Sequence, residues 1–80
     1  MQNSIFMMKT KKGKKAVIVN DMVLVKTDKG PRKGAIMYIS GDSDEKAVYT
    51  IAIPYDDENW KDDLVDIHAS ETEEYILDKL

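Results

Sequence analysis

The sequence contains no cysteine. Disulfide bridges, thiolate zinc sites and cysteine nucleophiles are therefore excluded, and a reducing compartment such as the cytoplasm fits this composition. Apolar runs such as MVLV and AVIV are far shorter than the ~20 residues that a membrane-spanning helix needs. The first residues, MQNSIFMMKTKKGKK, lack the form of a secretory signal peptide, because the lysines follow the short apolar run instead of preceding it. We therefore expect a soluble, cytoplasmic protein.

Histidine is almost as scarce, since His68 is the only one in the chain. In the stretch LVDIHA, strand alternation places Val65 and Ile67 on one face and His68 on the other, beside Asp66. Asp62 shares this polar face, which could hold a weak divalent ion, but a zinc site needs three or four well-fixed ligands. We interpret His68 as a surface residue and expect no metal site and no cofactor.

Catalytic motifs are absent as well. With one histidine and no cysteine, a nucleophile–base pair would have to use Ser70 or Thr72, and neither lies in an elbow motif. One route to catalysis stays open, in which tyrosine and lysine side chains from several copies of the chain meet at an oligomer interface. Our prediction is a protein that is not an enzyme and has no catalytic residues.

Charge is distributed unevenly along this single 80-residue domain. Residues 1–40 carry nine Lys/Arg and two Asp, a net charge of +7, whereas residues 41–80 carry three Lys and thirteen Asp/Glu, a net charge of −10. Such asymmetry is typical of a basic nucleic-acid arm joined to an acidic body. The alternative that we favour is that the two halves lie side by side and partly neutralise each other, because in so small a domain every surface lies within a Debye length or two of another.

The chain has the pattern of short strands separated by turns. Gly13 suits a turn that needs a positive φ, and Asn20-Asp21 suits a bend. The stretches TDKGPRKG and GDSDE are further breaks. The expected strands are Ala16–Val19, Met22–Thr27, Ala35–Ser40, Ala47–Ile53 and Leu64–Ala69. The short apolar run Ile5–Lys9 either pairs with Ala16–Val19 in a hairpin or is a floppy start of the chain.

Alternation predicts which side chains are buried in these strands. In the strongest strand, Tyr49, Ile51 and Ile53 point one way, and Pro54 should end the ladder or lie at a sheet edge. The strand AIMYIS is apolar almost throughout, which predicts burial on both faces or a place in an interface.

The last residues allow two structures. Ser70 and Glu73 fit a capping box, which predicts a helix, but a single helical turn followed by a short strand YIL fits residues 71–80 as well. Four or five short strands with turns between them favour a small all-β barrel or sandwich.

The stretch NDMVLVKTDKGPRKGAIMYIS is the most distinctive part of the sequence. It resembles the Src-homology-3-like small barrels, including the KOW and Tudor-like groups, in which a strand D-x-V-x-V precedes a basic loop and a glycine that opens the next strand. The residues that fit this outline are Asp21, Val23, Val25, Gly30, Lys33, Gly34 and Ile36.

The resemblance spans about residues 16–77 and includes YTIAIPYDD as the third strand and LVDIHASETEEYI as the closing strand with its helical turn. It implies a mainly β fold, a small five-stranded Src-homology-3-like barrel with a short C-terminal helical turn or helix, and a tendency to bind other molecules. Residues 1–15 are then either a flexible basic arm or an extra hairpin.

Two kinds of partner are suggested by the residues. The acidic loop around Trp60 offers an aromatic anchor with a charged rim, which suits a protein partner with a basic surface. Its candidate residues are Tyr55, Asp57, Trp60 and Asp63. A small adaptor, a host-factor-binding protein of a phage or other mobile element, or a homo-oligomer fits this hypothesis.

Nucleic acid is the alternative partner. Two basic turns could follow a phosphate backbone if they lie together in the fold. The candidate residues are Lys11, Lys12, Lys14, Lys15, Lys29, Arg32 and Lys33.

Overall fold

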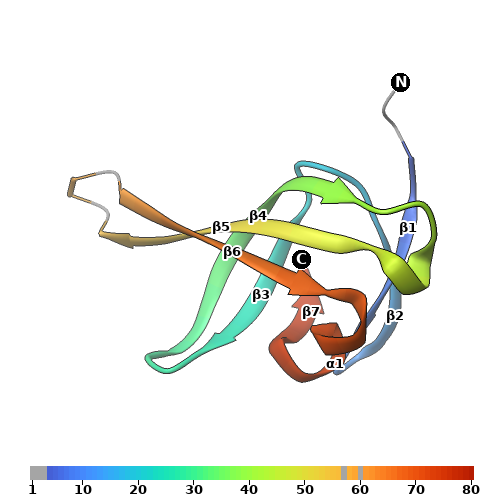
Figure 1. Cartoon of the computed structure of the whole chain (residues 1–80). Helices are drawn as coiled ribbons and strands as arrows, with labels where there is room; N and C mark the ends of the chain where they lie inside the picture. The colour runs from blue at the N-terminus through green and yellow to red at the C-terminus, as the bar shows by residue number, and fades with distance from the viewer. Residues whose placement is uncertain (1–3, 57, 60) are drawn as a thin grey trace.

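The protein is mainly β, as predicted (Figure 1). The computed structural model describes residues 4–56, 58–59 and 61–80, and for residue 56 it describes the backbone alone. None of the helices in these ranges is long and apolar enough to span a membrane. The elements in chain order are β1 (Phe6–Thr10), β2 (Gly13–Val17), β3 (Met22–Thr27), β4 (Gly30–Ser40), the 3₁₀ turn η1 (Asp44–Lys46), β5 (Val48–Asp56), β6 (Lys61–His68), the 3₁₀ turn η2 (Ala69–Glu71), α1 (Thr72–Tyr75) and β7 (Ile76–Lys79).

The strands form a two-stranded hairpin, β1-β2, and an antiparallel five-stranded sheet of order β6-β5-β4-β3-β7. The five-stranded sheet is not closed into a barrel, so this part of the prediction is wrong. In the described residues its two edge strands, β6 and β7, do not pair with each other, so the sheet stays open. In addition, β4 pairs with β5 only along 35–40, whereas β5 continues with β6 to residue 56. The β3-β4 and β5-β6 hairpins therefore separate toward their tips as two arms (Figure 1).

One buried cluster joins the hairpin to the inner face of the sheet. Met8 and Val17 from β1-β2 pack over side chains of β3 to β7, and the rings of Phe6 and Tyr49 meet edge to face with centroids 6.5 Å apart. Of the two alternatives for residues 1–15, the described part forms the extra hairpin. The cluster consists of Met8, Val17, Val23, Val25, Ile36, Ala47, Tyr49, Ile51, Ile53, Ile67 and Ile76.

The alternation predicted for the central strands is confirmed in β5, where Tyr49, Ile51 and Ile53 are all buried. The prediction that the strand AIMYIS, which is part of β4, is buried on both faces is wrong. Met37 and Tyr38 are 51% and 61% exposed, at the point where a register shift between Ile36 and Tyr38 inserts an extra residue into β4.

β4 is longer than predicted, since it begins at Gly30 and the turn before it has only two residues. Pro31 is tolerated inside β4 because β5 pairs with β4 only from Ala35 onward, so this part of β4 has a neighbour on one side alone. Pro54 likewise lies in a part of β5 that pairs with β6 and no longer with β4, which is the edge position that the sequence predicted.

The C-terminal residues form a single helical turn followed by a strand, the second of the two alternatives. The Ser70–Glu73 capping box is wrong. Within the described residues, Glu71 is the residue that reaches back, and its Oε1 accepts a hydrogen bond of 3.3 Å from the backbone N–H of His68. The α-helix consequently starts at Thr72, whose hydroxyl donates to the carbonyl of Ala69.

Candidate functional site

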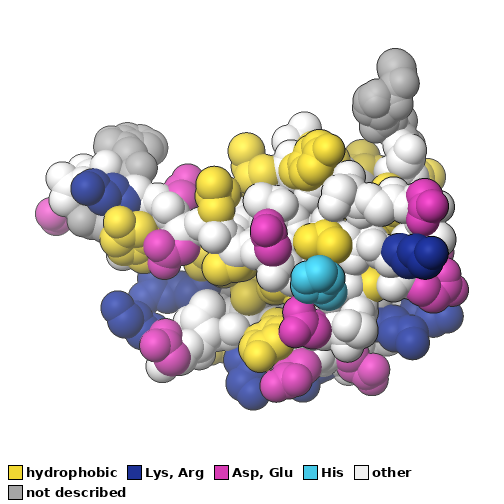
Figure 2. All heavy atoms as spheres, in the orientation of Figure 1, with side chains coloured by type: hydrophobic (Ala, Val, Ile, Leu, Met, Phe, Trp, Pro, Cys, Tyr) yellow, Lys and Arg dark blue, Asp and Glu magenta, His cyan; other side chains and the backbone are white. Residues whose placement is uncertain are grey.

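An open cleft of about 600 Å³ lies between the two arms, where the inner face of the sheet continues beyond its covered core. Figure 2 shows this hollow at the left of the molecule, with hydrophobic side chains at its base. Val25, Ile53, Val65 and Ile67 line it from three strands, and Tyr55 and Tyr75 line it from the β5-β6 arm and from α1. Val65 is partly exposed and Tyr55 and Tyr75 are exposed in this cleft, whereas Val25, Ile53 and Ile67 are buried at its base.

Strand register decides which charged side chains face this cleft. Arg32 is paired with Val25, so it shares the inner face with that buried residue, whereas Lys33 is paired with Leu24 on the opposite face. On the other arm, Asp63 is paired with Ile53 and therefore also belongs to the inner face.

The two walls of the cleft carry opposite charges. The β3-β4 wall has a net positive charge, from Lys26, Lys29 and Arg32 together with Asp28. The wall formed by β6 and η2 has a net negative charge, from Asp63, Asp66 and Glu71. Among residues that the structure describes, no ion pair joins the two walls, since the two ion pairs present are Lys15–Asp78 and Lys79–Asp21. The charges on both walls are thus available to a bound molecule.

The predicted protein-binding residues are only partly covered by the structure. Tyr55 and Asp63 line the cleft, and Tyr55 is 52% exposed. Asp57 and Trp60 lie outside the described residues.

The predicted nucleic-acid residues fall into two groups in the fold. The turn with Lys11 and Lys12 lies beside α1, where the backbone N–H of Lys11 donates to Ile76 O at 3.0 Å, and the β3-β4 turn projects at the far side of the molecule (Figure 1). Lys29 and Arg32 therefore belong to the cleft, and Lys33 belongs to the opposite face of the sheet. The remaining residues, Lys11, Lys12, Lys14 and Lys15, stay together in the β1-β2 hairpin.

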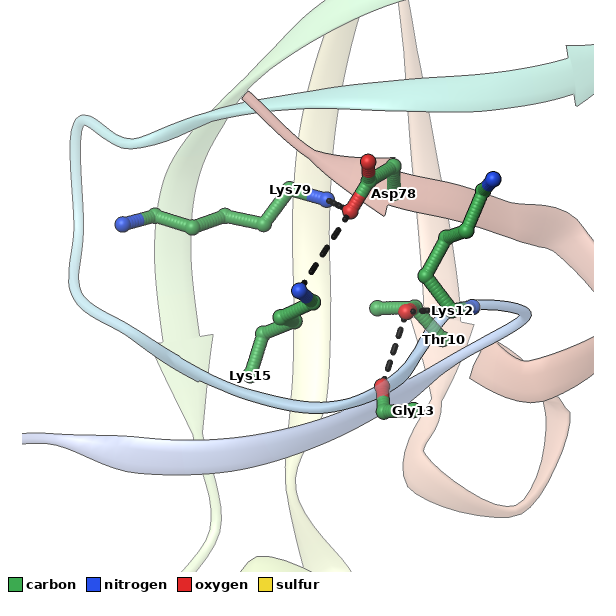
Figure 3. Close-up of polar contacts among 6 residues, drawn as sticks. All are labelled: Thr10, Lys12, Gly13, Lys15, Asp78 and Lys79. Carbon is green, nitrogen blue, oxygen red and sulfur yellow. Dashed lines mark hydrogen bonds and ion pairs between the residues drawn. The ribbon is translucent and has the colours of Figure 1, made fainter.

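The β1-β2 turn is held by Thr10 (Figure 3). Its hydroxyl donates to Gly13 O at 2.8 Å and accepts from the N–H of Lys12 at 3.0 Å. Lys15 lies 3.9 Å from a carboxylate oxygen of Asp78, so this lysine is already engaged by an acidic neighbour.

His68 is exposed at the end of β6, on the outer face, as the alternation predicted. Asp66 on the same face accepts a hydrogen bond of 2.8 Å from the Thr50 hydroxyl. Throughout the described ranges, no group of three or more His, Asp or Glu side chains converges in a geometry that could hold a metal ion.

Some cleft residues were not singled out from the sequence. Val65 was assigned only to the core, and Glu71 and Tyr75 only to the C-terminal turn. Lys29 and Arg32 were singled out, but for nucleic acid and not for this cleft, because the sequence does not show which strand register places them opposite Asp63.

Comparison with known proteins gives no relative for this chain. No protein-family model matches the sequence, and neither curated proteins nor solved structures give a significant match.

Proposed function

We propose that this chain is a non-catalytic, cytoplasmic binding module that holds a segment of another protein in the cleft between its two arms. The fold that we propose for it is an opened form of the Src-homology-3-like small barrel. What supports this fold is the meander from β3 to β6, the short helical turn after it, and the last strand β7 beside β3.

The observation that carries the function is an open cleft that combines apolar and aromatic side chains with opposite net charges on its two walls. Val65, which is partly exposed, and Tyr55, which is 52% exposed, offer apolar and aromatic surface to a partner side chain beside the buried Val25 and Ile53. Binding energy in protein interfaces concentrates at such desolvated apolar and aromatic centres, whereas a charged rim mainly steers and orients the partner.

The presence of both positive and negative side chains favours a polypeptide over a nucleic acid as the molecule bound in this cleft. Asp63 and Glu71 would repel a phosphate backbone that approached Lys29 and Arg32. A peptide, in contrast, can carry an acidic side chain toward one wall and a basic side chain toward the other.

The test is recovery of a specific partner by immobilised protein, followed by a binary binding measurement with the purified partner. Tyr55→Ala and Arg32→Glu should each weaken that binding about tenfold or more, because both side chains line the cleft. Lys33→Glu is the matched control, because it makes the same charge change one residue away on the opposite face. Equal losses from Arg32→Glu and Lys33→Glu would contradict a site in the cleft.

Trp60→Ala stays a prediction from the sequence alone. We expect it to abolish recovery of the partner while the circular dichroism spectrum stays unchanged. Unfolding of this variant would instead mean that Trp60 belongs to the core.

A second candidate function, nucleic-acid binding, is favoured by one observation in the β1-β2 hairpin. Lys9 and Lys14 lie directly opposite each other on neighbouring strands and are both exposed. Like charges in this position destabilise a hairpin, so a bound polyanion would relieve their repulsion. Lys11 and Lys12 at the adjacent turn are exposed as well and extend the basic surface.

A further inference from the structure

Among the residues that the structure describes, no strand pairs with the outer edge of β6. β6 is the first strand of the sheet and has β5 as its neighbour on one side only, over the eight residues Lys61–His68. The opposite edge of the sheet, β7, is shorter and is partly engaged, because Ile76 O accepts a hydrogen bond from the β1-β2 turn. A bare edge strand is a template for another strand.

The backbone of β6 directs alternate groups toward this edge. Ala69 N–H donates inward to Ala47 O at 2.8 Å, whereas His68 N–H donates away from β5, to Glu71 Oε1. In an antiparallel pair these directions alternate, and the β5-β6 register is unbroken from residue 62 to residue 68. The N–H and C=O groups of Leu64 and Asp66 therefore point to the free edge.

Side chains on both faces of β6 offer contacts to an added strand. On the inner face, an added strand would place every second side chain over the cleft beside Val65 and Ile67. On the outer face, the other side chains would lie beside Asp62, Leu64 and Asp66, and Leu64 is 68% exposed there.

The charge of β6 selects the kind of strand that fits. β6 carries one lysine and three aspartates, a net charge of −2 with His68 neutral. Pairing of β6 with β6 of a second copy would bring two such strands together, which like-charge repulsion disfavours. A strand with lysine or arginine at alternate positions would instead pair opposite charges across the edge.

We propose that the partner segment binds as an added β-strand along the free edge of β6, with apolar side chains directed into the cleft and Lys or Arg side chains directed to Asp62 and Asp66. This inference rests on the proposed protein-binding function and names the geometry and chemistry of its ligand. Main-chain hydrogen bonds supply affinity in this mode of recognition, and alternate side chains supply specificity.

The first test uses synthetic peptides as probes. The peptide KVKVKVK should bind the full chain, and EVEVEVE should bind at least about tenfold more weakly because it places like charges opposite β6. Two further versions of KVKVKVK carry backbone N-methyl groups on all Lys or on all Val residues. Only alternate N–H groups of a strand face its neighbour, so one version should lose about tenfold in affinity while the other stays within about threefold of the parent peptide.

The second test uses the protein. Binding of KVKVKVK should protect the Leu64 and Asp66 amide protons from exchange with solvent, because these are the groups at the free edge. Leu64→Pro removes one of those donors without breaking the ladder to β5 and should weaken peptide binding about tenfold. Leu64→Thr is the matched control, since it changes the same side chain and keeps the N–H.

Charge is tested by Asp62→Lys, which should weaken KVKVKVK and strengthen EVEVEVE. Asp42→Lys makes the same change in the exposed bend that follows β4 and should leave both affinities unchanged. If Leu64→Pro does not fold, the N-methyl peptides and the amide exchange still decide the question.

The outcomes separate the two proposals. Peptide binding that is lost in Tyr55→Ala but is insensitive to both N-methyl patterns and to Leu64→Pro would overturn strand addition and leave the cleft as a binding site. No binding of KVKVKVK up to about 1 mM would overturn strand addition by a basic segment. A concentration-dependent dimer that Leu64→Pro makes monomeric would show that a second copy of the chain occupies the edge.

Discussion

Gly34 sets how closely β4 and β5 approach each other. It is paired with Val23, and a Cβ placed on it would lie 2.6 Å from Ile51 Cγ2 and 3.2 Å from Ile53 Cγ1. Side chains do not tolerate the shorter of these distances, so an added methyl group must displace a buried isoleucine. Because Ile53 also lines the cleft, Gly34 connects the packing of the sheet to the shape of the candidate site.

We predict that Gly34→Ala lowers the free energy of unfolding by about 1–3 kcal/mol through overpacking. Urea denaturation followed by circular dichroism measures this change. Gly30→Ala is an informative comparison, because nothing lies within 4 Å of a Cβ at Gly30 and its cost comes from a φ of +97° alone. Asn tolerates positive φ better than Ala does, so Gly30→Asn should be less destabilising than Gly30→Ala. At position 34 the problem is space, so Gly34→Asn should be no less destabilising than Gly34→Ala.

Tyr49 is the largest fully buried side chain, and among the described residues its hydroxyl has no hydrogen-bond partner. Burial raises the pKa of Tyr49 from 10.0 to about 12, and the Asp44 carboxylate adds to this effect. The neutral phenol is therefore favoured in the folded state. Stability from this source is complete below pH 10, the pKa of an unfolded tyrosine, and is lost as the pH rises from 10 toward 12.

Tyr49→Phe removes both the buried hydroxyl and this titration. We predict that its free energy of unfolding is unchanged or up to about 1 kcal/mol higher at pH 8, because an unpaired buried polar group is removed. Denaturation curves at pH 8, 10 and 11 should show a smaller alkaline loss of stability in Tyr49→Phe than in the wild type. An identical alkaline loss in both proteins would show that Tyr49 is not its source.

At the level of elements, the two hairpin turns share one design. In TKKG and in TDKG, the threonine hydroxyl donates to the glycine carbonyl, at 2.8 Å for Thr10 and 2.6 Å for Thr27. Each hydroxyl also accepts from the backbone N–H two residues later. The two turns differ in burial, since Thr10 is buried and Thr27 is partly exposed.

Thr→Val substitutions test this design, because valine keeps the shape and the strand preference and removes only the hydroxyl. We predict that Thr10→Val lowers the free energy of unfolding by about 1–3 kcal/mol, since the partners of the buried hydroxyl lose their bonds where water enters poorly. Thr27→Val should cost less, because water can replace its hydroxyl. Chemical denaturation of the two variants measures the difference, and the reverse order would contradict this interpretation.

For the whole molecule, the question is how the basic and acidic halves of the chain are combined. The fold brings them together at β7, where Lys15 lies near Asp78 and Lys79 lies 3.8 Å from Asp21. Both pairs are partly exposed, so each contributes little to stability. The basic and acidic halves of the chain therefore neutralise each other only locally, around β7. The β1-β2 hairpin still has exposed lysines at positions 11, 12 and 14.

Nucleic-acid binding is tested with a single-stranded 20-nucleotide DNA at several salt concentrations. If the hairpin binds phosphates, replacing Lys11, Lys12 and Lys14 together by Ala should weaken binding and reduce the slope of log affinity against log salt by about 2. The control replaces Lys26, Lys46 and Lys61 by Ala, which removes the same charge from other parts of the surface. Equal effects of the two triple variants would indicate attraction by overall charge without a defined site.

Much of the local structure could be predicted from the sequence, because it depends on residues close together in the chain. Alternation in MVLVKT and AVYTIAI sets the buried faces of β3 and β5, and Asn20, which has a φ of +84°, occupies the predicted bend. Prediction failed at the start of β4, where turn-forming residues lie inside a strand. Gly30, Pro31 and Gly34 indicated a long loop, but β4 includes all three because each occupies a position in the sheet that tolerates it.

The candidate site depended on contacts that no local pattern contains. Arg32 and Asp63 are 31 positions apart in the chain, and they line one cleft because both register positions fall on the inner face of a sheet that stays open. The closure of a sheet depends on twist, bulges and the length over which distant strands pair, and these are decided by packing across the whole molecule. The sequence by itself thus determined which side chains face inward, and only the tertiary structure decided that some of them remain uncovered between two arms.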